Sequence, residues 1–191
     1  MGIAQPLKEI IQAAYQKDEL RTVVVADLTT DKYDFFAKLV PPQEPHKDTP
    51  QVGKWAVELQ KEITRKFGIK GNLETRKTDV LVLMPNRTGV RGFKISHTMP
   101  GGYASKNGSG SMSCFEQPVS SLVRDLERKF RMPIIDRTGL TERYDFALKW
   151  NEPDRKQPNL EGLKQALHDQ LGLELVPTNM PIEMLVVERV K

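Results

Sequence analysis

Hydrophobic residues recur at helical spacing after two prolines in this chain of 191 residues. In the first half they follow Pro6, at Leu7, Ile10, Ile11 and Ala14. In the second half they follow Pro118, at Val119, Leu122, Val123, Leu126 and Phe130. Proline suits the first turn of a helix, and apolar positions three and four apart share one helical face. The pattern therefore predicts helices over about residues 6–16 and 118–130.

Short apolar or alternating segments follow each predicted helix. They cover residues 21–26 and 33–39 in the first half, and residues 133–136 and 143–150 in the second. Within the last segment, Tyr144, Phe146, Leu148 and Trp150 share one face, as in a half-buried strand. Two strands are expected after each helix.

A second helix and a final pair of strands are predicted in each half. Trp55, Leu59, Ile63 and Phe67 form one helical stripe that Gly68 ends, and residues 163–171 form a similar stripe that ends at the glycine at position 172. Residues 69–73 and 78–84 are expected to form a hairpin. Residues 173–176 and 182–190 are expected to be strands on either side of a turn at 177–181.

The two halves also have similar amino-acid sequences. Residues 32–38 read KYDFFAK and residues 143–149 read RYDFALK. Residues 59–69 align without a gap with residues 163–173, which lie 104 positions later, and the same offset places residues 80–83 on 184–187. Such self-similarity indicates a duplicated unit. We predict an α+β fold of two related α-β-β-α-β units, with helices packed on mixed or antiparallel sheets.

Glycine and proline mark the predicted boundary between the units. They break the periodic pattern over residues 85–110, at the end of which the run NGSGS begins at position 107. We therefore expect a first unit at residues 1–84, a Gly-rich linker at 85–110 with a short strand at residues 93–95, and a second unit at 111–191.

Composition and charge narrow the classes of partner. The formal net charge of +4 comes from 29 basic and 25 acidic residues spread along the chain, so no basic patch for nucleic acid is expected. The apolar runs are far shorter than the roughly 20 residues of a membrane span, so no transmembrane segment is expected. Residues 1–5 lack the charged and apolar regions of a secretory signal. The single cysteine, Cys114, excludes an internal disulfide and a cysteine-based metal site, and no fingerprint of a cofactor is present.

Several segments together resemble a known family. Residues 136–146 read DRTGLTERYDF, residues 163–175 read LKQALHDQLGLEL and residues 182–188 read IEMLVVE. These resemble D-K-T-G-L-T-G-R-Y-D-F, A-L-Q-E-Q-L-G-L-K-L and P-V-E-V-L-V-I-D-H in the soil-associated bacterial family of unknown function DUF3738. Residues 7–15 and 59–76 also resemble its early helix and its L-L-A-x-R-F-x-L-x-x-H-R-E-T-R segment. The chain departs from the family at residues 24–34, and the family's extended segment ahead of the first helix is missing.

The resemblance implies an exported or envelope-associated protein. Members are sometimes fused to redoxin-like or membrane-peptidase domains, and no catalytic residue set is established for them. The order of elements is also similar to the small N-terminal domain of secretins and TonB-dependent receptors, which is a likeness of topology alone.

The turn that begins at Asp136 holds the most distinctive peptide. As a recognition loop, it would present Asp136, Arg137, Thr138 and Gly139 to a partner, together with Tyr144 and Asp145 of the following strand. As a structural turn, the aspartate would accept backbone hydrogen bonds and the glycine would supply a positive φ, which would set the register of a hairpin. Turn chemistry needs these residue types in any case, and the structural interpretation is favoured.

Acid–base or nucleophilic chemistry has few candidates. Asp34 and Asp145 occupy matching places in the two halves, and we expect each to form a cross-strand ion pair rather than a catalytic dyad. Cys114 with His97 would make a nucleophile and base, although a lone cysteine before a helix is more often a core residue.

Metal and aromatic ligand sites are not indicated. The three histidines, His46, His97 and His168, lie too far apart for a local metal motif, and His168 is expected to face solvent. Trp55 and Trp150 are expected in the core.

Two hypotheses of function follow. The first is a non-catalytic envelope module, monomeric or weakly oligomeric, that binds a protein or peptide by adding a strand to an exposed sheet edge. The alternative is a hydrolase or redox accessory enzyme with a site between the two units.

Overall fold

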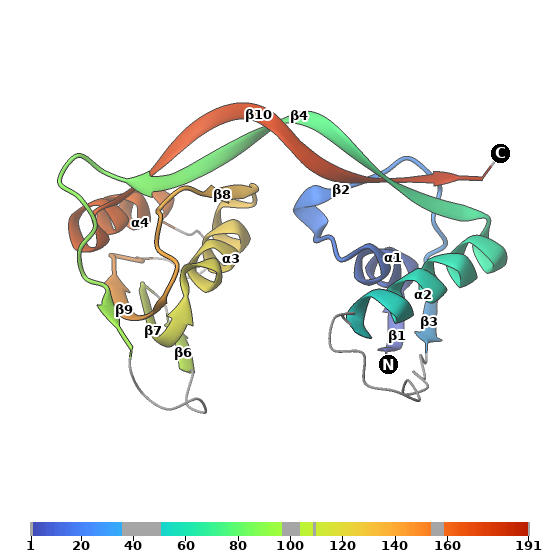
Figure 1. Cartoon of the computed structure of the whole chain (residues 1–191), viewed down its shortest axis with the longest axis horizontal. Helices are drawn as coiled ribbons and strands as arrows, with labels where there is room; N and C mark the ends of the chain where they lie inside the picture. The colour runs from blue at the N-terminus through green and yellow to red at the C-terminus, as the bar shows by residue number, and fades with distance from the viewer. Residues whose placement is uncertain (1, 36–50, 97–103, 109, 154–158, 191) are drawn as a thin grey trace. The chain divides into compact units, whose positions relative to one another are not determined.

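The computed structural model of the chain describes residues 2–35, 51–96, 104–108, 110–153 and 159–190 (Figure 1). The chain forms two compact units. Unit 1 comprises Met1–Lys77 and Pro181–Lys191, and unit 2 comprises Thr78–Met180. Two long strands, β4 (Ile69–Pro85) and β10 (Leu173–Arg189), contribute one end to each unit.

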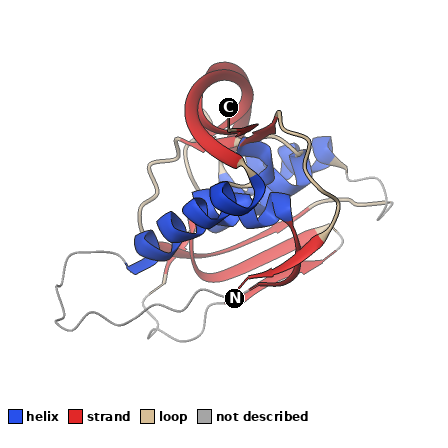
Figure 2. Cartoon of the chain, turned by 90° about the vertical axis from the view of Figure 1, so that its right-hand side faces the viewer, coloured by secondary structure: helices blue, strands red, loops and turns tan. Residues whose placement is uncertain are grey.

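Unit 1 contains two helices between strands of two sheets. Its other elements are β1 (Gly2–Pro6), α1 (Leu7–Tyr15), the 3-10 turn η1 (Glu19–Arg21), β2 (Thr22–Val24), β3 (Lys32–Phe35) and α2 (Gln51–Phe67). In Figure 1, α1 and α2 lie between the β1–β3 pair on one side and β2 with the ends of β4 and β10 on the other. Figure 2 shows the helices of this unit in blue with red strands on both sides.

Unit 2 has the same layers with more strands. Its other elements are β5 (Lys94–Ile95), β6 (Ala104–Gly108), β7 (Ser111–Pro118), α3 (Val119–Phe130), β8 (Ile134–Asp136), β9 (Arg143–Lys149), α4 (Leu160–Ala166) and the π-helical turn η2 (Leu167–Leu171). The antiparallel sheet has the order β5-β9-β7-β6, and the other sheet has the order β2-β10-β4-β8. The fold is therefore α+β with mixed and antiparallel sheets, as predicted.

The helices form for the reasons that the sequence indicates. Pro6 and Pro118 precede α1 and α3, and each of these helices ends at a residue in the left-handed region, Gln16 and Arg131, both with φ 53°. The apolar stripe of α1 and that of α3 are buried in the cores of units 1 and 2. Gly68 (φ 63°) follows α2. These positions confirm the predicted helices.

The hairpin predicted at residues 69–84 and the two strands predicted around a turn at 177–181 are each one continuous strand instead. β4 runs without a break across residues 74–77, and β10 runs across the prolines at 177 and 181. Among the described residues, the side of β10 away from β4 pairs with β2 at residues 185–187, so the stretch that contains the prolines has no partner strand on that side. Proline is tolerated in a strand beside an unpaired edge, where its missing N–H leaves no ladder hydrogen bond unmade. The turn residues were therefore poor guides to the end of a strand.

The division into units also differs from the expected boundaries. The segment 85–110, expected to be a linker, contributes β5 and β6 to the antiparallel sheet of unit 2. β8 pairs in parallel with the end of β4 in unit 2, and β2 pairs in parallel with the end of β10 in unit 1. Each unit thus takes its parallel partner strand from the other half of the sequence. None of the helices in the described part of the chain is long and apolar enough to span a bilayer.

Candidate functional site

The Asp136 turn is held by its own side chains. The backbone N–H and the hydroxyl of Thr138 donate to Oδ1 of Asp136 at 2.9 and 2.7 Å, and the N–H of Leu140 donates to the Thr138 hydroxyl at 3.2 Å. Thr138 is buried, and Gly139 has φ 74°. Asp136 and Thr138 are thus brought together, but by turn chemistry. The turn connects β8 and β9, which lie in different sheets, so it does not set a hairpin register.

A second turn of the same kind follows β4. Residues 86–89 read NRTG where residues 136–139 read DRTG. The N–H and hydroxyl of Thr88 donate to Oδ1 of Asn86 at 2.9 and 2.6 Å, and Gly89 has φ 79°. Since β4 and β8 are parallel neighbours, both turns end strands of one sheet. The shared R-T-G wording was a signal that sequence reasoning missed.

The matched aspartates occupy equivalent positions in two β-bulges. Oδ1 of Asp145 accepts the N–H of Glu116 at 2.7 Å, and Oδ1 of Asp34 accepts the N–H of Ala4 at 2.7 Å. Glu116 and Ala4 have φ 53° and 52°, in the left-handed region that non-glycine residues rarely adopt. The expected cross-strand ion pairs are therefore replaced by backbone hydrogen bonds, because each bulge leaves one N–H for the carboxylate to accept.

The other residues proposed for the recognition loop do not converge with these groups. Tyr144 is 7% exposed and lies in the core of unit 2, next to Asp145 on β9. Because successive side chains of a strand point to opposite faces, the two do not share a surface. The Arg137 side chain is exposed, and its backbone N–H donates to the carbonyl of Leu83 at 2.8 Å. The six predicted residues thus stabilise two separate local structures.

The antiparallel sheets of the two units have the same register around these bulges. In unit 1 the paired residues of β1 and β3 are Gly2 with Phe35, Gln5 with Tyr33, and Pro6 with Lys32. In unit 2 those of β7 and β9 are Cys114 with Phe146, Gln117 with Tyr144, and Pro118 with Arg143. Each pair in unit 2 matches a pair in unit 1 that lies 112 positions earlier in the first strand and 111 positions earlier in the second.

The matched sheets differ at the side of β9 and β3 that faces away from β7 and β1. In unit 2, β5 pairs with β9, with Lys94 opposite Asp145 and Ile95 opposite Tyr144. The Phe93 ring lies 5.5 Å from that of Tyr144 and 5.1 Å from that of Phe146, measured between centroids. In unit 1, β1 and β3 form a sheet of two strands, and among the described residues none pairs with the outer side of β3. We call this side, at Lys32–Phe35, the β3 edge.

Aromatic burial follows this difference between the sheets. Tyr144 and Phe146, which contact Phe93, are 7% and 5% exposed. The matched residues Tyr33 and Phe35 are only partly buried. Phe67 packs edge-on against Tyr33 at 5.0 Å between centroids. Tyr33 and Phe35 share one face by alternation along the strand, but no local signal showed that this edge has no partner strand among the described residues.

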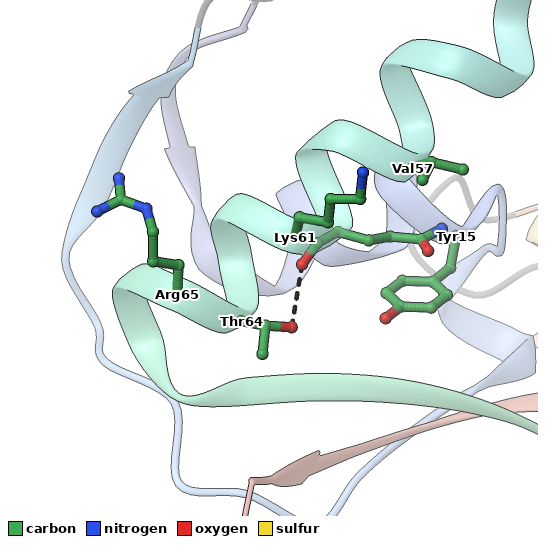
Figure 3. Close-up of a pocket in the computed structure, with 6 residues that line it drawn as sticks. Tyr15, Val57, Lys61, Thr64 and Arg65 are labelled. Atoms are coloured by element: carbon green, nitrogen blue, oxygen red, sulfur yellow. Dashed lines mark hydrogen bonds between the residues drawn. The ribbon is translucent and has the colours of Figure 1, made fainter.

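A shallow groove of about 450 Å³ lies on α2 beside the end of α1. Figure 3 shows the side chains that line it. It is lined by Tyr15, Val57, Gln60, Lys61, Thr64 and Arg65. Its two cations are already paired one turn away, Lys61 with Glu58 at 2.7 Å and Arg65 with Glu62 at 2.6 Å. The Tyr15 hydroxyl accepts the N–H of Gly71 at 2.9 Å. The groove therefore presents no unpaired cation and no nucleophile with an adjacent base.

The proposed nucleophile lies in a core. Cys114 is 0% exposed within the hydrophobic cluster of unit 2, which also includes Phe146. Its proposed partner His97 lies outside the described residues, as does His46. His168 is half exposed, and its Nδ1 lies 3.0 Å from the Asp169 carboxylate. This contact, followed by the hydrogen bond from Gln165, lowers the pKa of Asp169.

Metal-binding side chains do not gather in the part of the chain that the structure describes. No group of three or more His, Cys, Asp or Glu side chains there could hold an ion. Trp150 packs against the core of unit 2, donates through Nε1 to Glu152 and carries the Lys129 ammonium 4.9 Å from its ring centroid. Trp55 on α2 is partly buried. The described part of the chain thus contains hydrogen-bonded turns, bulges and hydrophobic cores, and no assembled catalytic centre is found among its side chains.

Comparison with known proteins places the chain in a family without naming an activity. No curated protein matches the chain, and no solved structure does. The likeness to secretin and TonB-receptor domains therefore stays a prediction. The family described as "Protein of unknown function (DUF3738)" matches residues 8–190, which is nearly the whole chain, and the protein belongs to it.

Proposed function

We propose that this protein is a non-catalytic binding module that docks an extended segment of another protein or peptide on a sheet edge. One observation carries the proposal: the antiparallel sheet of unit 1 has the register and bulge of the sheet in unit 2, yet among described residues its β3 edge has no partner strand. An unpaired edge presents backbone donors and acceptors that an extended peptide satisfies by adding a strand.

We further propose that the two units arose by duplication of one unit. The matched bulges, the register of both sheets and the left-handed ends of α1 and α3 support this origin. In the sheet with the order β2-β10-β4-β8, Leu81 pairs in parallel with Ile134 and Leu185 pairs in parallel with Thr22. Leu185 lies 104 positions after Leu81, which is the offset found in the sequence. Duplication would supply two versions of one antiparallel sheet. The version in unit 1, whose β3 edge has no partner strand among the described residues, would then bind a segment of another protein.

The resemblance to exported family members supports an extracytoplasmic or envelope location. Fractionation of cells that produce the full-length protein, with sequencing of its mature N-terminus, tests this location. Recovery in the envelope or periplasm is expected. Recovery of an intact protein in the cytoplasm would contradict the location without bearing on strand addition.

The binding function is tested by selection from a display library of random twelve-residue peptides on the purified chain. Selected peptides are expected to slow amide hydrogen exchange along an outer strand of an antiparallel sheet. Failure to select any peptide would refute the proposal, as would protection confined to the helix groove at Tyr15 and Lys61. A peptide that binds but leaves every strand amide unprotected would also refute strand addition.

A further inference from the structure

We propose that the β3 edge binds an extended peptide in which a lysine is flanked by two large apolar residues. The peptide runs antiparallel to β3, with its lysine opposite Asp34 and its second apolar residue opposite Tyr33. This proposal rests on the proposed function and specifies its edge, register and ligand chemistry. Its source is the segment of unit 2 that occupies the equivalent edge, which reads Phe-Lys-Ile-Ser at residues 93–96.

The backbone of unit 2 shows which groups the peptide would use. The N–H of Ser96 donates to the carbonyl of Arg143 at 3.0 Å, and Lys94 is paired with Asp145. The N–H and C=O of one residue point to the same side of an antiparallel strand, and this side alternates along the strand. Those of Arg143 and Asp145 therefore face β5, and those of Tyr144 face β7. In the matched strand, the N–H and C=O of Lys32 and of Asp34 face outward.

The pairing within unit 1 agrees with this orientation. Lys32 is opposite Pro6, which has no N–H, so the carbonyl of Lys32 has no donor in Pro6. Among the described residues, no strand takes up the outward groups of β3. Two residues of a peptide, at the positions of Lys94 and Ser96, are in register to bond to them.

Apolar contact adds to the backbone bonds. In unit 2, Phe93 covers the rings of Tyr144 and Phe146, which are nearly inaccessible. In unit 1 the matched Tyr33 and Phe35 keep accessible surface, although Phe67 already packs on Tyr33. A large apolar residue ahead of the lysine would remove this surface from water, which is favourable in proportion to the area buried.

Charge sets a preference at the central position. The Asp34 side chain is exposed, and its Oδ1 accepts the N–H of Ala4. A lysine opposite Asp34 repeats the placement of Lys94 opposite Asp145. Because an exposed ion pair contributes little, the lysine favours this register more than it adds affinity.

The test uses a capped six-residue peptide with the sequence of residues 91–96, Arg-Gly-Phe-Lys-Ile-Ser, titrated into the isotope-labelled full chain. Saturable shifts of backbone amides are expected at Lys32–Phe35, with slowed exchange of the Asp34 amide. No binding at millimolar peptide would overturn the inference. Shifts confined to Asp145 and its neighbours would also overturn it, because the peptide would then be replacing β5 of its own unit.

Two N-methylated peptides provide matched controls that leave the protein unchanged. Methylation of the lysine amide removes a donor that faces β3, and about a tenfold or greater loss of affinity is expected. Methylation of the isoleucine amide, which faces away from β3, is expected to change affinity by less than about threefold. Equal effects of the two would overturn the register.

The apolar contact is tested by replacing the phenylalanine of the peptide with alanine, which is expected to weaken binding at least tenfold. Unchanged affinity would overturn the contact with Tyr33 and Phe35. If library peptides protect another outer strand, such as β6, while this peptide does not bind, the ligand proposed for the β3 edge is wrong and the binding function stands. If neither binds, both proposals fail.

Discussion

Removing the Asp145 carboxylate should destabilise unit 2 by about 2 kcal/mol. The carboxylate accepts the Glu116 N–H at 2.7 Å in a partly buried site, and a hydrogen bond to a charged group contributes about 1.5–3 kcal/mol. It also holds Glu116 at φ 53°, a conformation whose cost of about 1 kcal/mol would otherwise favour opening of the bulge. Asp145→Ala loses the hydrogen bond, and relaxation of Glu116 offsets part of this loss, whereas Asp145→Asn keeps an uncharged acceptor and should lose about half as much.

Asp34→Ala provides a matched comparison in unit 1. The bond from Ala4 has the same length, but Asp34 is exposed, so its loss should cost about 1 kcal/mol or less. Each unit contains one tryptophan, Trp55 in unit 1 and Trp150 in unit 2. Urea unfolding followed by fluorescence in Trp55→Phe and Trp150→Phe backgrounds would therefore report the two units separately.

Amide exchange identifies the cause of the destabilisation. The Glu116 amide should exchange faster in Asp145→Ala than the neighbouring amides of β7, because it loses its acceptor while the ladder remains. The explanation would be refuted if the Glu116 amide exchanged as in the parent protein, or if Asp145→Ala and Asp34→Ala lowered stability equally.

Two further predictions concern local structure in unit 2. Gly139→Ala should cost about 1 kcal/mol from its φ of 74° alone, since an added Cβ there meets no atom within 4 Å. Gly172→Ala (φ 65°) should cost several times more, because its Cβ would overlap the Gly89 carbonyl. Thermal unfolding of both variants should show this order of stability, and equal losses would contradict it. The pKa of Asp169 lies below its ordinary value through the hydrogen bond to His168, so this carboxylate favours the folded state above its unfolded pKa and loses that contribution as pH falls through the lower folded pKa. An NMR titration should show that His168→Ala raises the pKa of Asp169, and an unchanged pKa would contradict the assignment.

The sequence was sufficient for the elements that local chemistry controls. Apolar spacing after Pro6 and Pro118 predicted α1 and α3, because a stripe on one helical face must be buried wherever the helix packs. The positive φ of Gly139 and the turn role of Asp136 also followed from residue type. The α+β class could be predicted for the same reason, since it depends on the order and period of the elements.

The site could not be predicted in this way because it depends on pairing between distant strands. The local sequence does not distinguish Asp34 and Asp145 from other aspartates in strands. Only the register of β1 with β3 and of β7 with β9 places a bulge amide against each carboxylate. The short strand expected at residues 93–95 is confirmed as β5, but two residues are too few to show which strand it pairs with.

The sequence by itself determined the α+β class, most of the helices and strands, and membership of a family. The tertiary structure decided how these sets pair: β4 and β10 continue past their expected turns, and each ends beside a strand from the other half of the sequence. It also decided that β9 is covered by β5 while, in the described chain, β3 is not. The physical reason is that strand pairing satisfies backbone groups, which are alike in every residue, so side-chain patterns do not reveal which edge is left open.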